Sequence, residues 1–183
     1  MDNGASSYRR FLDGDESAFD DIMNELFRGL VFFIDRYVQD VHAAEDLAID
    51  VFSDLIVHRK RYNFKVTLKT YLFMLGRSRA LDYIKHRKVI RFVDISEANG
   101  VADERQTLEE MVLADERKRF VNAAIAGLRE DMRAAIHLVY FEGLTYDETA
   151  RVMKKNRKQV DNLLYRAKKE LRIILGEDGE QLI

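Results

Sequence analysis

The chain of 183 residues has no cysteine, no proline and no tryptophan, and only nine glycines. The absence of cysteine excludes disulfides, zinc–thiolate sites and thiol nucleophiles. Because helix breakers are scarce and apolar residues recur at three- and four-residue steps, the sequence predicts an all-α protein. It has no 18-residue apolar run and no apolar signal core near its N-terminus, so we expect a cytoplasmic protein without membrane insertion.

The apolar pattern divides the chain into two helical domains, at 8–91 and 114–175, joined by an acidic linker at 92–113. In the first domain we expect a long amphipathic helix with Ser17 as its N-cap, then helices over 41–58 and 68–88. The inner face of the 41–58 helix is expected to carry Ala44, Leu47, Val51, Leu55 and Ile56. In the second domain we expect helices over 115–126 and 130–141, capped by Gly127 and Gly143, and then a helix pair.

Charge lies in blocks, although the whole chain has a net charge of only −2. Residues 1–58 carry a net −9 and residues 59–91 a net +10, followed by −7 over 92–116 and +7 over 117–175. Such blocks suggest different partners for different parts of the chain. Because their signs are opposite, we also expect the free protein to be compact, with the acidic linker near a basic surface.

The segment LTYDETARVMKKNRKQVDNLLYRAKKELR, residues 144–172, predicts a helix-turn-helix. Thr145 with Glu148 forms a capping-box pattern for the first helix, and Asn156 with Gln159 repeats it for the second. The second helix has an apolar inner face and a basic outer face that offers donors to phosphates and base edges. Taken by itself, the segment also fits a simple helical hairpin with a solvated basic face.

Three motifs in this order resemble the extracytoplasmic-function (ECF) sigma factors of bacterial RNA polymerase. The first is FLDGDESAFDDIMNELF followed by RYVQD, the second is AEDLAIDVFSDLIVHR, and the third is the helix-turn-helix segment. Between the second and third lies TLKTYLFMLGRSRALDYIKHRK, which matches the family's aliphatic–aromatic pattern. The resemblance covers about residues 8–175 and implies sigma region 2 in the first domain and region 4 in the second.

The resemblance implies a polymerase-binding face on the acidic helix over 41–58. In the family this face docks on the coiled coil of the largest polymerase subunit, and acidic groups facing a basic partner favour orientation and association rate. The residues expected there are Glu45, Asp46, Asp50, Phe52 and Asp54, with Phe52 also a candidate for core support. Without the family, the same acidic residues would be interpreted as a solvated face.

The basic block over 59–91 is expected to recognise and melt the −10 element. Aromatic rings interleaved with cations suit unpaired bases, which stack on rings. The resemblance places Tyr62, Asn63, Phe64 and Lys65 in a loop that holds a flipped base. The neighbouring helix is expected to contribute Tyr71, Ser78, Arg79, Asp82, Lys85, Arg87 and Lys88, the last three through phosphates. Core packing of Tyr71 and a loop-anchoring role for Phe64 are the alternatives.

The helix-turn-helix is expected to read the −35 element in the major groove. The candidate contacts are Arg157, Lys158, Gln159, Asn162, Arg166 and Lys169. The other face of this domain is expected to meet the polymerase flap.

Several positions depart from the family's usual residues. Arg129 replaces a proline, Ile49 a glutamine, Tyr71 a tryptophan and Ser78 an asparagine. Asp161 adds a negative charge to the recognition helix, so we expect an unusual −35 preference.

The sequence thus predicts a sigma factor that is a monomer when free, has no catalysis of its own and needs no cofactor or metal. Its expected partners are the RNA polymerase core, promoter DNA and an anti-sigma factor. One alternative is a stand-alone helix-turn-helix repressor or activator, which would bind duplex DNA without polymerase, usually as a dimer. A carboxylate metalloenzyme is disfavoured, because such bundles use Glu-x-x-His motifs and this chain has none.

Overall fold

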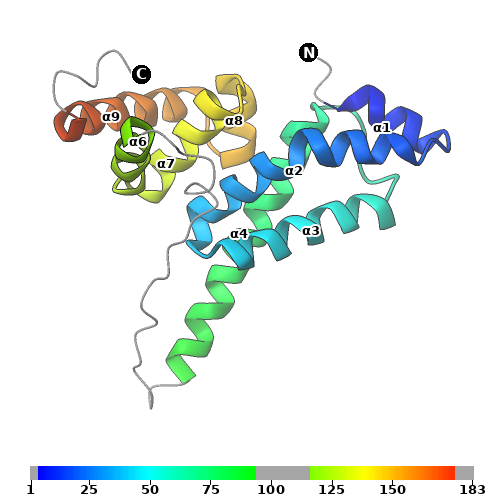
Figure 1. The fold of residues 1–183 in the computed structure, drawn as a ribbon, viewed down its shortest axis with the longest axis horizontal. Helices are drawn as coiled ribbons and strands as arrows, with labels where there is room; N and C mark the ends of the chain where they lie inside the picture. Colours follow the sequence, from blue (N-terminus) through cyan, green and yellow to red (C-terminus); the bar gives the residue numbers. More distant parts are fainter. Residues whose placement is uncertain (1–3, 94–115, 176–183) are drawn as a thin grey trace.

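The computed structural model describes residues 4–93 and 116–175, and within these ranges all regular structure is helical (Figure 1). The first bundle consists of α1 (Ala5–Leu12), α2 (Ser17–Val38), α3 (Val41–Val57) and α4 (Leu68–Val93). The second consists of α6 (Glu116–Ala126), α7 (Glu130–Ile136), the π-helix η1 (His137–Phe141), α8 (Tyr146–Met153) and α9 (Arg157–Leu175). The predicted all-α fold with two helical domains is confirmed, whereas most of the predicted linker lies outside the described residues.

The core of the first bundle forms where α2 packs between α3 and α4. Phe33, Phe52 and Phe73 are fully buried there, together with leucines at 30 and 72. The two longest helices approach closely because Gly76 has no side chain, since a Cβ at that position would lie 2.7 Å from Leu30 Cδ1. This rigid bundle carries the loop between α3 and α4 at one end.

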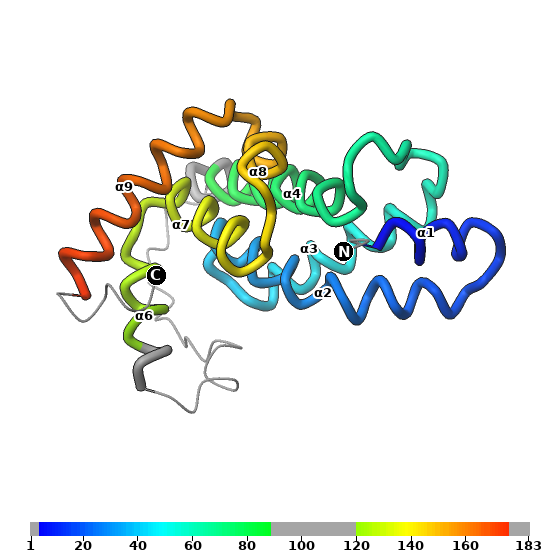
Figure 2. The backbone as a smooth tube through the Cα atoms, turned by 90° about the horizontal axis from the view of Figure 1, so that it is seen from above, coloured from blue at the N-terminus to red at the C-terminus, as the bar shows by residue number. Residues whose placement is uncertain are grey.

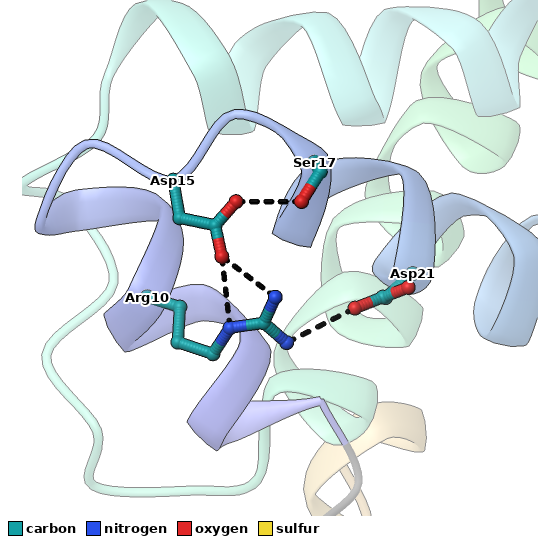
Figure 3. A network of polar contacts seen from close by, with 4 residues as sticks. All are labelled: Arg10, Asp15, Ser17 and Asp21. Atoms are coloured by element: carbon teal, nitrogen blue, oxygen red, sulfur yellow. Dashed lines mark hydrogen bonds and ion pairs between the residues drawn. The ribbon is translucent and has the colours of Figure 1, made fainter.

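The start of α2 differs from the prediction. Ser17 was expected to be the N-cap, but Glu16 occupies that position and Ser17 is the first helical residue. The Ser17 hydroxyl instead donates to Asp15 at 2.6 Å, and Arg10 binds both Asp15 and Asp21 (Figure 3). The side chains that could have capped the helix thus fasten α2 to α1, a helix that the sequence pattern did not predict.

The predicted caps of the helix-turn-helix are confirmed. Thr145 Oγ1 accepts from the Glu148 amide while the Glu148 carboxylate accepts from the Thr145 amide. Asn156 and Gln159 make the same reciprocal pair, at 2.8 and 2.9 Å. Gly143 has the left-handed φ of +68° typical of a helix C-terminus, whereas Gly127 ends α6 without one.

The two bundles pack against each other, with α7 and η1 on α2 and α8 on α4 (Figures 1 and 2). The prediction of a compact particle is therefore correct for the two helical domains. Its second part, the position of the acidic linker, falls outside the described residues. None of the described helices combines the length and apolarity needed to cross a membrane.

Candidate nucleic-acid and polymerase interfaces

The loop between α3 and α4 is built on a cluster of aromatic rings. Tyr62 is only 3% exposed, and its hydroxyl donates to the Val66 carbonyl at 2.6 Å. Its ring centroid lies 4.6 Å from that of Phe64 and 5.1 Å from that of Tyr71. Tyr62 therefore packs beneath the surface of the loop and supports it, and in this conformation its buried ring is not accessible to a base.

Phe64 occupies the outer surface of this loop. Its backbone has a φ of +60°, a left-handed conformation that is costly for a residue with a Cβ. The ring is 36% exposed, and the Arg9 guanidinium lies 5.1 Å from its centroid. The neighbouring turn is fixed because Asn63 Oδ1 accepts from the Lys65 amide at 3.1 Å. The loop thus holds an aromatic face towards solvent among cationic groups.

Tyr8 in α1 also anchors this loop, although the two are far apart in the sequence. It is fully buried, and its hydroxyl donates to the Arg59 carbonyl at 2.8 Å, with the Leu55 carbonyl at 3.3 Å. Its ring packs edge-on against Tyr62, at a centroid distance of 5.5 Å. Burial raises the pKa of Tyr8 to about 12, so the hydroxyl remains a donor. Tyr8 was not predicted to support this loop; the signal available in the sequence was the three-residue spacing of Tyr8 and Phe11.

An open groove begins at the loop and continues onto α4. Its lining includes Asn63, Lys65 and Tyr71, and also Arg151 from α8. Along α4, Tyr71, Ser78, Asp82 and Lys85 are separated by seven, four and three residues, so they share one face. The structure therefore brings the loop and these predicted α4 residues onto a continuous surface. The remaining predicted residues, Arg79, Arg87 and Lys88, are exposed beside it, and Arg87 lies 4.0 Å from Asp40.

The outer face of α3 combines acidic and apolar side chains. Asp46 and Asp50 are exposed, and Glu45 is half-buried. The predicted inward position of Ile56 is wrong, because its side chain is exposed together with those of Ile49 and Val57. These residues give the exposed face an apolar component that the sequence analysis did not predict.

Two of the predicted polymerase contacts on α3, Phe52 and Asp54, are buried or largely buried. Phe52 is buried in the core against Phe19 and Phe27, so it supports the helix and does not contribute to its outer surface. Asp54 is largely buried and pairs with Arg61 at 3.1 Å and with His58 at 3.5 Å. Because Arg61 lies in the loop, this contact joins the acidic helix to the loop.

The recognition helix α9 presents all six of its predicted contacts to solvent: Arg157, Lys158, Gln159, Asn162, Arg166 and Lys169. Its other face buries Val160, Leu164 and Leu171 against the rest of the second bundle. Arg157 forms an exposed ion pair with Asp147 at 3.2 Å, which holds the guanidinium at the start of the helix. Gln159 uses its side-chain oxygen for the cap, so its amide group remains available as a donor.

These features define a two-part helical DNA-binding protein, with an aromatic loop in one part and a helix-turn-helix in the other. Comparison with known families identifies both parts: Sigma-70 region 2 matches residues 22–89 and Sigma-70, region 4 matches residues 121–171. The chain belongs to the sigma-70 family, in its ECF group. It is an RNA polymerase sigma factor, and sigma factors are initiation factors rather than enzymes. A stand-alone repressor is not favoured.

Characterised relatives extend over most of the chain. It is 26% identical over 153 residues to the ECF RNA polymerase sigma factor SigM of Bacillus subtilis, covering 83% of this chain and 89% of the relative. It is 27% identical over 169 residues to the ECF RNA polymerase sigma-E factor of Escherichia coli, covering 86% of each.

Solved structures show the same fold. The sigma factor RpoE of Bartonella quintana, in complex with the anti-sigma factor NepR, matches with a TM-score of 0.69 and 20% identity, over 87% of this chain and 98% of the other. CnrH in complex with the cytosolic domain of CnrY matches with a TM-score of 0.63 and 17% identity, over 96% of each chain.

Proposed function

We propose that this sigma factor directs promoter-specific initiation by binding core polymerase through α3 and reading the −10 and −35 elements through the loop and α9. In this proposal region 2 extends over 8–91 and region 4 over 114–175, and the polymerase supplies all the chemistry of phosphoryl transfer. The factor acts in the cytoplasm, as a monomer until it meets polymerase.

The arrangement of the loop is the observation that carries the proposal. Unpaired bases bind where a ring offers a stacking surface and neighbouring cations neutralise the phosphates. Phe64 supplies the exposed ring, and the groove beside it contains Arg61, Lys65 and Tyr71. Because Tyr62 and Tyr8 fix the loop from beneath, little ordering is required when a base enters.

The −35 contacts divide by their position on α9. The start of a recognition helix usually meets base edges, so Arg157, Lys158 and Asn162 are assigned to bases or adjacent phosphates. Arg166 and Lys169 lie farther along the helix and are assigned to phosphates, which add affinity without sequence information. Asp161, exposed in the same segment, repels phosphate and narrows the range of positions that the helix can adopt on DNA.

The polymerase contact is assigned to the exposed part of α3. Asp46 and Asp50 provide charge complementary to a basic partner, and Ile49 with Val57 provides apolar area beside them. Phe52 and Asp54 support this surface indirectly, one from the core and the other through Arg61. Two solved structures of the same fold contain an anti-sigma factor or a cytosolic partner domain. We therefore include an anti-sigma factor among the partners of this chain.

Run-off transcription with bacterial core polymerase, on a library of promoter-like duplexes, tests the function directly. Transcripts should require the protein and should fall sharply with Phe64→Ala, while removal of the exposed ring of Tyr140, outside the loop, should have little effect. Arg157→Ala should change which −35 sequences are used. Tight duplex binding by the protein alone, without polymerase binding or transcripts, would refute the proposal.

A further inference from the structure

The loop between α3 and α4 is joined to α1 by two stacks of an arginine on a phenylalanine, one in each direction. The Arg9 guanidinium of α1 lies 5.1 Å from the centre of the Phe64 ring in the loop. The guanidinium of Arg59, which follows α3, lies 4.4 Å from the centre of the Phe11 ring in α1. A cation over the face of an aromatic ring is attracted by the negative charge of that face. The surface around Phe64 therefore includes a cation that comes from α1.

The backbone of Arg9 is fixed because α1 is held along its whole length. At its start, Gly4 is buried with a φ of +82°, and a Cβ there would lie 3.1 Å from a leucine side chain of α4. In its middle, Tyr8 is fully buried beneath the loop. At its end, Arg10 binds two aspartates that lie before and within α2 (Figure 3). Only the side chain of Arg9 is therefore free to change position, which keeps the entropy cost of a new contact low.

The two arginines of α1 have different surroundings, although they are adjacent in the sequence. The Arg10 guanidinium lies 2.6 Å from a carboxylate oxygen of Asp15 and 3.2 Å from one of Asp21. Arg9 is exposed, and no carboxylate of the described residues forms an ion pair with it. A guanidinium presents its N–H groups as a planar fork that fits two phosphate oxygens at once. Arg9 thus combines an available charge with the geometry that suits a phosphate.

Phe64 can stack a base only on the part of its ring that the protein leaves open. Tyr62 and Tyr8 pack against this ring, at centroid distances of 4.6 and 6.2 Å, and Arg9 lies over it. The stack of a cation on an exposed ring is weak, so an entering base can displace the guanidinium. A stacked nucleotide also brings its own phosphate close to the ring, within reach of a side chain as long as that of arginine. The displaced guanidinium therefore finds a stronger partner nearby.

α1 lies outside the part of the chain that the family match covers. Sigma-70 region 2 matches residues 22–89, which include the loop, whereas α1 ends at Leu12. Membership of the family therefore assigns no role to Arg9. Its position beside the loop follows from the contacts of this chain.

We propose that Arg9 is a further DNA contact of this sigma factor and binds the phosphate of the nucleotide whose base stacks on Phe64. This inference rests on the proposed function, because it requires the loop to bind an unpaired base. Before the base enters, the same guanidinium covers the ring. Because a phosphate contact carries no sequence information, loss of Arg9 should weaken the binding of all −10 sequences alike.

The contact is measured by fluorescence anisotropy, with polymerase holoenzyme and a single-stranded oligonucleotide that carries the −10 sequence selected by run-off transcription. Arg9→Gln should weaken binding about fivefold to tenfold at low salt. It should also make the slope of log affinity against log salt shallower by about 0.7, the value for one phosphate of a single strand. Loss of folded structure alone would not produce that change of slope.

Arg10→Gln is the matched control, because it removes the same charge from the next residue. It also breaks the ion pairs that hold the end of α1, so it would be the more damaging variant if α1 acted only as a support. Such exposed pairs contribute little to stability. Arg10→Gln should therefore bind the oligonucleotide with the affinity and the salt slope of the parent.

A second measurement locates the phosphate. Abasic substitutions identify the stacked nucleotide, since removal of its base should weaken binding by the parent but not by Phe64→Ala. An uncharged methylphosphonate beside that nucleotide should weaken binding by the parent and leave Arg9→Gln unaffected. Equal affinity and slope for Arg9→Gln and the parent, or equal methylphosphonate losses in both, would overturn the role of Arg9 and leave the proposed function intact. A parent holoenzyme that binds no −10 oligonucleotide would overturn both.

Discussion

The two proposed DNA-binding parts of this molecule, the helix-turn-helix and the loop between α3 and α4, are held in place by different kinds of contact. In the second bundle, the helix-turn-helix is fixed by contacts over three residues, as in the Thr145–Glu148 and Asn156–Gln159 pairs. In the first bundle, the loop between α3 and α4 (the −10 loop, named for its proposed role) depends on Tyr8, whose hydroxyl donates to a carbonyl 51 residues away in the sequence. Contacts between residues a few positions apart can be recognised in the sequence as a motif, whereas contacts between residues far apart in the sequence can be recognised only in the folded structure.

Because the loop depends on a contact with a distant residue, we expect it to be sensitive to substitution of Tyr8, which lies outside the surfaces assigned to DNA. Tyr8→Ala removes a fully buried ring from beneath Tyr62 and Phe64, and should lower the free energy of unfolding by about 3–5 kcal/mol. Urea unfolding followed by circular dichroism measures it. Tyr8→Phe keeps the ring and removes only the hydroxyl, so its cost should be about 1 kcal/mol. Equal losses for the two variants would show that the hydroxyl, rather than the ring, holds the loop.

Phe64 tests whether the ring at the surface of the loop acts on DNA or on stability. Phe64→Ala should weaken binding of a single-stranded −10 oligonucleotide by polymerase holoenzyme by about 1–3 kcal/mol, the usual loss for a stacked base. Its effect on unfolding should be small because the ring is partly exposed. Fluorescence anisotropy measures the binding. If the oligonucleotide binds equally well while the unfolding free energy falls, Phe64 is a loop anchor.

The same comparison explains which features could be predicted from the sequence. The helix period and the capping residues act within a few positions, so the helix-turn-helix and the exposed face of α9 were predicted correctly. Tyr62 was predicted as a base contact because the resemblance and the interleaved cations place it in the loop, whereas its burial and its ring contact with Tyr8 of α1 could not be predicted from the sequence. Ile56 was placed inward because a single helix pattern does not specify how wide its buried face is. The packing of the two bundles includes the ion pair between Lys69 and Glu142, which are 73 positions apart and form no recognisable pattern.

Removal of a local cap should have a smaller and more confined effect. Thr145→Ala should lower the free energy of unfolding by about 1 kcal/mol, because the Glu148 amide loses its acceptor. Thr145→Ser keeps the hydroxyl and is the matched control. The −10 loop should be unaffected, so oligonucleotide binding should match that of the parent. A loss of −10 binding would show that the capping box and the loop are coupled through Glu148.

The capping carboxylate also gives this region a dependence on pH. Burial would raise the pKa of Glu148, but hydrogen bonds from Thr145, Thr70 and Thr67 outweigh it, so the pKa lies below the ordinary value of 4.5. A lowered pKa in the folded state means that the stabilisation is present above pH 4.5 and is lost as the pH falls through the folded pKa. Between about pH 6 and pH 3, the thermal stability of the parent should therefore fall more steeply than that of Glu148→Gln. Parallel curves would contradict this.

The smallest effect on stability is expected for the outer face of α3, because its exposed side chains contribute little to packing. Asp46 is exposed, so Asp46→Asn should leave stability within about 0.5 kcal/mol of the parent. It should slow association with core polymerase a few-fold at low salt, because charges at the rim of an interface steer the encounter, and salt should remove the difference. Glu25→Gln removes a charge from another exposed position, on α2, and is the control for net charge. Stopped-flow association over a range of salt concentrations measures both. Equal slowing by the two variants would mean that polymerase senses the overall charge of the acidic block, and slowing by Asp46→Asn alone would locate the docking surface on α3.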